Sequence, residues 1–127
     1  MVTTAWHRLA EGLIAALEPA LPDGFEARFE VEDGGIAFFQ PDVPHAWVVA
    51  GVQPLVEQPG EERELVARVC LSVLDTAQDF VAEFTGDPWP GSAHDLPLPD
   101  VEVRDAEVWL WYGERESPTL VLGTIQL

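Results

Sequence analysis

The apolar residues between Glu61 and Phe84 recur at helical spacing more clearly than anywhere else in the chain. Placed at 100° per residue, most of them fall within roughly 60° of Val73, with charged residues opposite. Carboxylates in a first helical turn also favour a start near Glu61. The pattern predicts a long amphipathic helix that a sheet or a second helix must cover. Its apolar stripe consists of Val66, Val69, Cys70, Val73, Ala77, Phe80 and Phe84, widened at the edges by Leu65, Leu74 and Val81.

A first helix is predicted between Thr3 or Thr4, either of which can act as an N-cap, and Glu18. Pro19 ends it, because the residue before a proline is pushed out of the helical region. Gly12 costs about 1 kcal/mol relative to alanine inside a helix, so it is either tolerated or marks a close approach to a neighbour. The apolar positions that match the helical template are Trp6, Leu9, Ala10, Leu13, Ile14 and Leu17.

Three strands are predicted between these helices. Apolar and charged residues alternate without exception over Phe25–Glu32, as in an antiparallel strand with one solvent-exposed face. A hairpin through residues 33–35, an Asp-Gly-Gly run, returns the chain along Ile36–Gln40. Ala46–Val52 is almost continuously apolar, which indicates a third strand that is buried on both faces or offers one face to a partner.

Residues 86–100 are dense in proline and glycine and should form a loop. A loop of this length is a candidate site by position, and the alternative interpretation is a purely structural, proline-stiffened connection held by Trp89 and Leu96. Val101–Tyr112 and Thr119–Leu127 then read as the last two strands, with a bulge or break near residues 105–106.

The resulting order is α-β-β-β-α-β-β. We therefore expect an α+β fold with a single antiparallel sheet of about five strands and two helices packed on one face. The length of 127 residues suits one domain, residues 1–127.

Net charge narrows the choice of partners. Twenty-three acidic residues face only six basic ones, all arginine, so the formal charge is −17. Such a surface repels nucleic acid and anionic lipid and attracts basic proteins, so we expect neither direct nucleic-acid binding nor membrane association. The single cysteine, Cys70, cannot form an intramolecular disulfide, and no apolar run of membrane-spanning length is present. The first residues show no positive charge followed by an apolar run, so we expect no secretory signal. A cytoplasmic location is expected.

No catalytic or metal-binding motif is present. Phosphate-binding glycine loops, serine elbows and paired-histidine zinc motifs are missing, and the three histidines are far apart in sequence. Cys70 lies in the apolar stripe of the long helix, where a thiol is expected to be inert core. We expect no catalytic residues, no metal site and no cofactor, and favour a protein that is not an enzyme.

The tryptophans are more informative. Trp109 and Trp111 share one strand face, opposite the alternating apolar residues of the same strand. If helices cover only one side of the sheet, one of the two rows is exposed, and an exposed aromatic row marks an interaction surface. Alternatively, the proline-rich loop with Trp89 covers the second face.

Three functions remain open. The leading hypothesis is a non-enzymatic interaction module with Trp89, Trp109 and Trp111 as its candidate surface, which binds a basic protein or forms a homodimer. The second is a small-molecule binder or enzyme with a pocket between the sheet and the 86–100 loop, lined by Trp89, His94 and Asp95. The third is an inhibitor that mimics nucleic acid through its carboxylates.

Overall fold

The computed structural model of the protein describes residues 4–30, 35–40, 47–51, 62–91 and 96–126. Within these residues the chain forms two α-helices, one short 3-10 helix and six strands. Their bounds are α1 Thr4–Leu17, η1 Glu18–Ala20, β1 Glu26–Glu30, β2 Gly35–Phe39, β3 Trp47–Gly51, α3 Glu62–Thr85, β4 Pro99–Arg104, β5 Glu107–Gly113 and β6 Pro118–Gln126.

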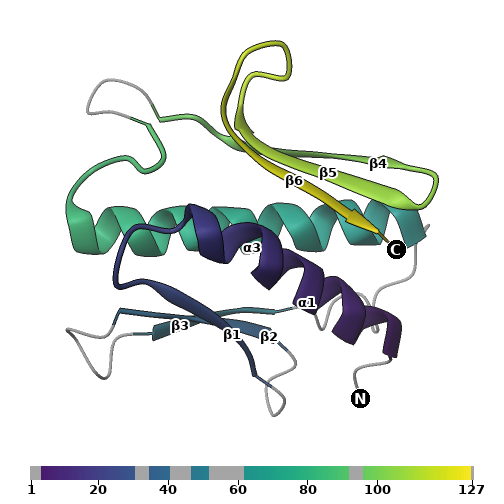
Figure 1. Cartoon of the computed structure of the whole chain (residues 1–127), viewed down its shortest axis with the longest axis horizontal. Helices are drawn as coiled ribbons and strands as arrows, with labels where there is room; N and C mark the ends of the chain where they lie inside the picture. The colour runs from purple at the N-terminus through teal and green to yellow at the C-terminus, as the bar shows by residue number, and fades with distance from the viewer. Residues whose placement is uncertain (1–3, 31–34, 41–46, 52–61, 92–95, 127) are drawn as a thin grey trace.

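The strands belong to two separate antiparallel sheets, ordered β1-β2-β3 and β4-β5-β6. Helix α3 lies between the two sheets, and α1 crosses beside it (Figure 1). The fold is α+β as expected, but the predicted single sheet of about five strands is wrong. The prediction that both helices pack on one face of that sheet is wrong for the same reason, since α3 has a sheet on each side.

The width of the buried side of α3 explains this arrangement. Its buried residues run from Leu65 to Gln78 around the helix, an arc of roughly 220° at 100° per residue, about twice what one covering surface needs. Phe80 points to the first sheet, where the centroid of its ring lies 6.3 Å from that of Phe38 in β2. On the second side, the hydroxyl of Tyr112 in β5 donates a hydrogen bond of 2.6 Å to the carbonyl of Leu74.

Helix α3 confirms the predicted helix to within one residue at each end. Every member of the predicted stripe is buried except Phe84, whose exposed fraction is 36%. Cys70 is fully buried in the core, as expected, and burial raises the pKa of its thiol to about 12. A thiol held neutral in this way is a poor nucleophile.

Helix α1 confirms the first predicted helix, with Leu9, Leu13 and Leu17 buried. Pro19 lies in the 3-10 turn that follows, so the α-helical hydrogen bonding ends where proline predicts. Gly12 marks a close approach. A Cβ at this position would lie 2.5 Å from Cγ2 of Ile125 in β6. The side chain of Trp6 lies outside the described part of the structure.

The first sheet contains the predicted hairpin of β1 and β2, with Ala27 opposite Phe38 and Phe29 opposite Ile36. Strand β2 is central and β3 pairs with its other edge, so the third predicted strand is also confirmed. The turn at residues 33–34 and the burial of the β3 side chains lie outside the described residues.

The second sheet divides the predicted strand Val101–Tyr112 into two strands and confirms the break expected near residues 105–106. Asp105 and Ala106 form a tight turn between β4 and β5, and Arg104 pairs directly with Glu107. Asp105 has a φ of 46°, in the left-handed region that aspartate tolerates better than most residues. The strand β6 matches its prediction. Its register shifts between Leu110 and Trp111, so that Leu122 is left without a partner on β5.

Candidate functional site

The two faces of β5 have different surroundings. Val108, Leu110 and Tyr112 point inward and are at most 1% exposed. Trp109 and Trp111 point the other way, and Trp109 is 38% exposed whereas Trp111 is 8% exposed. Residues directly opposite on neighbouring strands share a face of the sheet, so the strand register defines the remaining members of this side. We call it the outer face, and its strand residues are Asp100, Glu102, Arg104, Glu107, Trp109, Trp111, Val121, Thr124 and Gln126.

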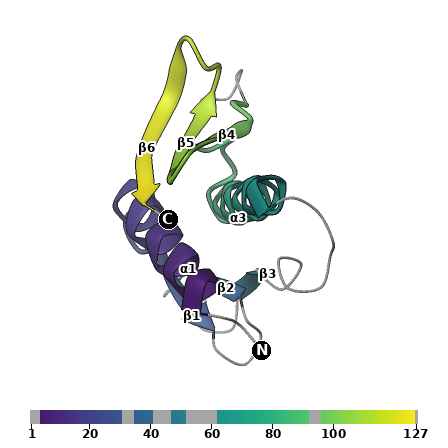
Figure 2. The ribbon, with the colours of Figure 1, turned by 90° about the vertical axis from the view of Figure 1, so that its right-hand side faces the viewer.

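No helix or strand among the described elements lies over the outer face (Figures 1 and 2). Six large apolar side chains in the described residues are at least 36% exposed. Trp109 and Val121 lie on the outer face, and Leu96 and Leu98 lie in the segment that leads into β4. Leu71 and Phe84 are exposed on α3, so the outer face carries two of the six, an aromatic and an aliphatic side chain that no described helix or strand covers.

A cleft of about 270 Å³ opens on the outer face. The two tryptophans, Pro118 and Val121 form its apolar part. Its charged rim comes from three further side chains, Glu102, Arg104 and Arg115. Its volume is slightly below the range of about 300–1,000 Å³ that small-molecule pockets occupy.

Charge at the cleft is organised around Glu102. Its two carboxylate oxygens accept bonds from different arginines, Oε2 from Arg104 and Oε1 from Arg115. The guanidinium of Arg104 also lies over the ring of Trp109, 5.2 Å from its centroid. Two of the chain's six arginines are thus held beside the tryptophans of a strongly acidic protein.

The indole of Trp111 has one unusual feature. Its Nε1 is buried and has no hydrogen-bond acceptor among the described residues. A buried donor without a partner costs about 1–3 kcal/mol relative to a satisfied one. The polar part of this side chain therefore contributes nothing to the stability of the fold.

Trp89 does not join Trp109 and Trp111. It packs on the inner side of the sheet, with its ring edge-to-face against Tyr112 and a centroid separation of 5.3 Å. The proline-rich loop therefore does not use Trp89 to cover the outer face. Leu96, the other expected anchor of that loop, is 54% exposed. His94 and Asp95, predicted to line a pocket with Trp89, lie outside the described residues.

The inner side of the second sheet is tied to α3 by buried polar contacts. Gln78 Nε2 donates a hydrogen bond of 2.6 Å to the carbonyl of Pro97, just before β4. Tyr112 bonds to the Leu74 carbonyl, and its burial raises the pKa of its hydroxyl, with a further contribution from the negative charges of Asp75 and Asp79. These groups position the sheet and lie away from the cleft.

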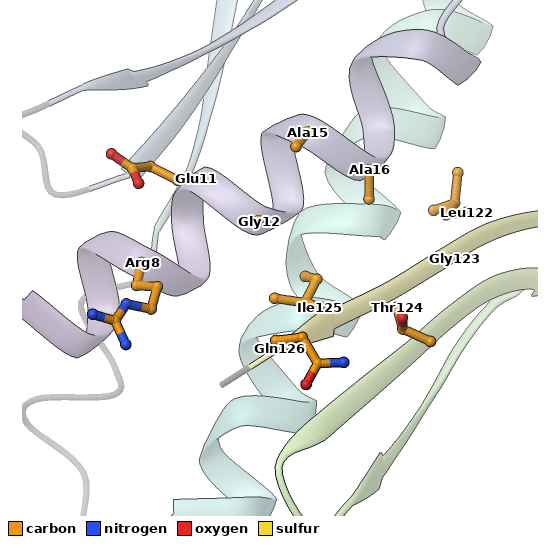
Figure 3. A pocket seen from close by; sticks show the side chains of 10 residues that line it. All are labelled: Arg8, Glu11, Gly12, Ala15, Ala16, Leu122, Gly123, Thr124, Ile125 and Gln126. Atoms are coloured by element: carbon orange, nitrogen blue, oxygen red, sulfur yellow. The ribbon is translucent and has the colours of Figure 1, made fainter.

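A second concavity, of about 570 Å³, lies between α1 and the edge strand β6 (Figure 3). Small residues of the helix, Gly12, Ala15 and Ala16, form its floor together with Ile125, and Arg8 and Glu11 lie at one end. It is a shallow groove, and no aromatic side chain lines it. It offers fewer binding groups than the outer face.

The described residues contain no group of three or more potential metal ligands. None of the helices in this part of the chain has the length and apolar character needed to cross a membrane. Comparisons with protein-family models, curated proteins and solved structures give no match to the chain. The assignment of a function therefore depends on the geometry of the outer face.

Sequence reasoning identified the tryptophan row but missed the charged network beside it. The sequence predicts a bulge or break at residues 105–106 but not the tight reversal that lays β4 along β5 and brings Arg104 to the face of Trp109. Arg115 lies 13 residues from Glu102 in sequence, and only the return of β5 along β4 brings them together. The available signal for this turn was the change in the alternation of apolar and polar residues at Asp105 and Ala106.

Proposed function

We propose that the protein is a non-enzymatic interaction protein that binds another protein through the outer face of the β4-β5-β6 sheet. The observation that carries this proposal is the exposed Trp109 with Arg104 stacked on it, on a sheet face that no described element covers. Tryptophan and arginine are the side chains that most often dominate the energetics of protein interfaces.

The arrangement is also partly fixed before binding. Glu102 holds Arg104 and Arg115, and the ring of Trp109 restricts Arg104 further. Immobilising a long side chain on binding costs about 0.5–1.5 kcal/mol, and side chains that are already ordered avoid part of that cost. This supports a role of the outer face in recognition.

The titratable groups do not favour catalysis. Among the residues that the structure describes, the two groups with clearly shifted pKa values, Cys70 and Tyr112, are buried in the core, and neither lines the cleft. Functional acids, bases and nucleophiles usually combine a shifted pKa with a cleft. This separation supports binding over enzymatic activity.

A basic protein remains a candidate partner because of the charge of −17. The acidic side of α3, with Asp75, Asp79 and Glu83 exposed, would attract it more strongly than the outer face, where two arginines lie. We also infer a cytoplasmic location. The single cysteine, buried in the core as a neutral thiol, suits a reducing compartment.

Differential capture from the native cells tests the proposal. The wild-type chain, a Trp109→Ala/Val121→Ser variant and a Leu71→Ala control serve as baits. Leu71 is an exposed apolar residue of α3, so its removal matches the loss of apolar surface at a different place. We expect the wild-type and control baits to retain at least one protein that the double variant loses. That protein can be another copy of the chain itself.

All three baits must keep the same far-ultraviolet circular dichroism and cooperative unfolding. Equal retention of every captured protein by the three folded baits would contradict the proposal.

A further inference from the structure

We infer that the partner that covers the outer face is a second copy of this chain. The inference rests on the proposed function, because it assumes that the outer face is an interface. It identifies the occupant from the charges on that face, from their order along β4 and from the net charge of the molecule.

The outer face carries both signs of charge. Asp100, Glu102 and Glu107 supply carboxylates, and Arg104 and Arg115 supply guanidinium groups. The chain as a whole has 23 acidic and six basic residues, so this face is much closer to neutral than the rest of the surface. Two acidic molecules meet with the least repulsion where their surfaces carry the least net charge.

The order of these charges also suits a two-fold symmetric contact. The outward residues of β4 are Asp100, Glu102 and Arg104, in that order. In a two-fold pair of sheets whose β4 strands run in opposite directions about Glu102, Asp100 of one copy faces Arg104 of the other, and the reverse pair forms at the same time. Glu102 then faces Glu102 of the other copy, and the arginines that each carboxylate already binds in its own chain offset the repulsion. A face that pairs with itself in this way is what an isologous interface requires.

Trp109 lies at the centre of the same contact, because it pairs with Glu102, the residue on the two-fold axis. Trp109 and Trp111 are on the middle strand of the sheet, with Val121 beside Trp111 on β6. Charged residues of β4 and Arg115 lie around them. An apolar centre with a polar rim is the usual anatomy of a protein interface.

The size of the face predicts a weak dimer. With a strand spacing of about 4.8 Å and a rise of about 3.4 Å per residue, three strands of about seven residues cover roughly 14 by 24 Å, an area of about 340 Å². This is smaller than the roughly 800 Å² per partner of a standard interface. We therefore expect a weak, transient dimer that exchanges with the monomer.

The salt dependence of binding distinguishes a second copy of the chain from a basic partner protein. Each copy carries −17, so the copies repel outside the contact, and moderate salt screens that repulsion. Self-association should therefore strengthen from low to moderate salt. Binding of a basic protein should weaken over the same range, because the attraction is screened.

Sedimentation equilibrium of the purified chain over a range of concentrations, at low and at moderate salt, tests the inference. We expect a concentration-dependent dimer with a lower dissociation constant at moderate salt. Val121→Arg should raise the dissociation constant by about tenfold or more, because it buries an unpaired guanidinium beside Arg115. Leu71→Arg makes the same change in net charge on α3, so it should leave the dimer intact. Chemical unfolding of both variants verifies that they fold.

A monomer at all concentrations in both salt conditions would overturn the inference, and so would a dimer that Val121→Arg leaves unchanged. If the purified chain is monomeric while another protein is lost from the Trp109→Ala/Val121→Ser bait, the proposed function stands and only the second copy is rejected. If neither the chain nor any other protein depends on the outer face, both fail.

Discussion

Alternate residues of β5 perform different tasks. Leu110 and Tyr112 point toward α3, are almost fully buried and hold the sheet in place. Trp109 and Trp111 point away, beside paired charges and a cleft. The hydroxyl of Tyr112 has a buried acceptor, whereas the indole N–H of Trp111 has none among the described residues. The contrast indicates that the inner row is optimised for the folded chain alone and that the outer row is not.

Leu110→Ala should show the largest loss of stability. The side chain is 1% exposed, and truncating a buried leucine usually lowers the free energy of unfolding by about 2–5 kcal/mol. Denaturant unfolding at a constant protein concentration measures it. A loss below about 1 kcal/mol would mean that the inner row does not form the tightly packed core described above.

Tyr112→Phe should cost less, about 0.5–1.5 kcal/mol, because it removes one buried hydrogen bond to the Leu74 carbonyl. It should also change the pH dependence of stability. Burial and the nearby Asp75 and Asp79 raise the pKa of Tyr112 above its ordinary value of 10.0, so the unfolded chain loses this proton first as pH rises. The stability that the neutral Tyr112 hydroxyl contributes is therefore fully present below about pH 10 and is lost as the pH rises from there toward the raised pKa of the folded state.

The measurement is the free energy of unfolding between neutral and alkaline pH. Cys70 adds a decline of the same sign that begins near its ordinary pKa of 9.0, and this part should remain in the variant. Wild type should therefore lose more stability above about pH 10 than Tyr112→Phe. Parallel curves for the two proteins would show that the hydroxyl is not buried against α3.

Trp109→Ala should weaken dimerisation more than it lowers the stability of the folded chain. The ring is 38% exposed, so truncation removes a partly buried ring as well as the cation–π pair with Arg104, and we expect the free energy of unfolding to fall by about 1–2 kcal/mol, less than for Leu110→Ala. Dimerisation should weaken by a larger amount, as is usual for a tryptophan at an interface centre. A variant that unfolds readily and still dimerises would place Trp109 in the core.

Trp111→Phe should have the smallest effect on stability, within about 0.5 kcal/mol. The smaller ring loses some packing, but the buried and unpaired indole N–H is removed with it, so the two effects oppose each other. Thermal unfolding of the dilute, monomeric protein is the check. A loss comparable to that of Leu110→Ala would indicate that the indole N–H has a stabilising acceptor.

Much of the fold could be predicted because periodicity is a local property. The helical repeat of α3, the repeat of α1 before Pro19 and the alternation of β1 each gave the correct element. The division into two sheets was missed, although Leu65, Leu74 and Val81 already widened the stripe of α3 beyond what one sheet covers. Periodicity shows which residues are buried and does not show how many surfaces bury them.

The candidate site was predictable only in part. Alternation predicts that Trp109 and Trp111 share a face, because residues two apart in a strand point to the same side of the sheet. Trp89 belongs to the same predicted surface, but its ring packs against Tyr112 on the inner side, and the sequence does not show on which side of the sheet the loop before β4 passes. Glu102 can pair with Arg104 and Arg115 only because of the β4-β5 turn. That turn contains no glycine, the residue that usually marks a tight turn in a sequence.

The most direct test of the outer face is fluorine NMR of the chain labelled with 5-fluorotryptophan. Trp→Phe variants assign the five resonances, and a dilution series at moderate salt follows them. We predict that the resonances of Trp109 and Trp111 shift with concentration, while that of Trp89, packed against Tyr112 inside the fold, stays constant. If sedimentation shows a dimer but Trp109 and Trp111 do not respond, or if Trp89 responds in their place, the outer face is not the interface.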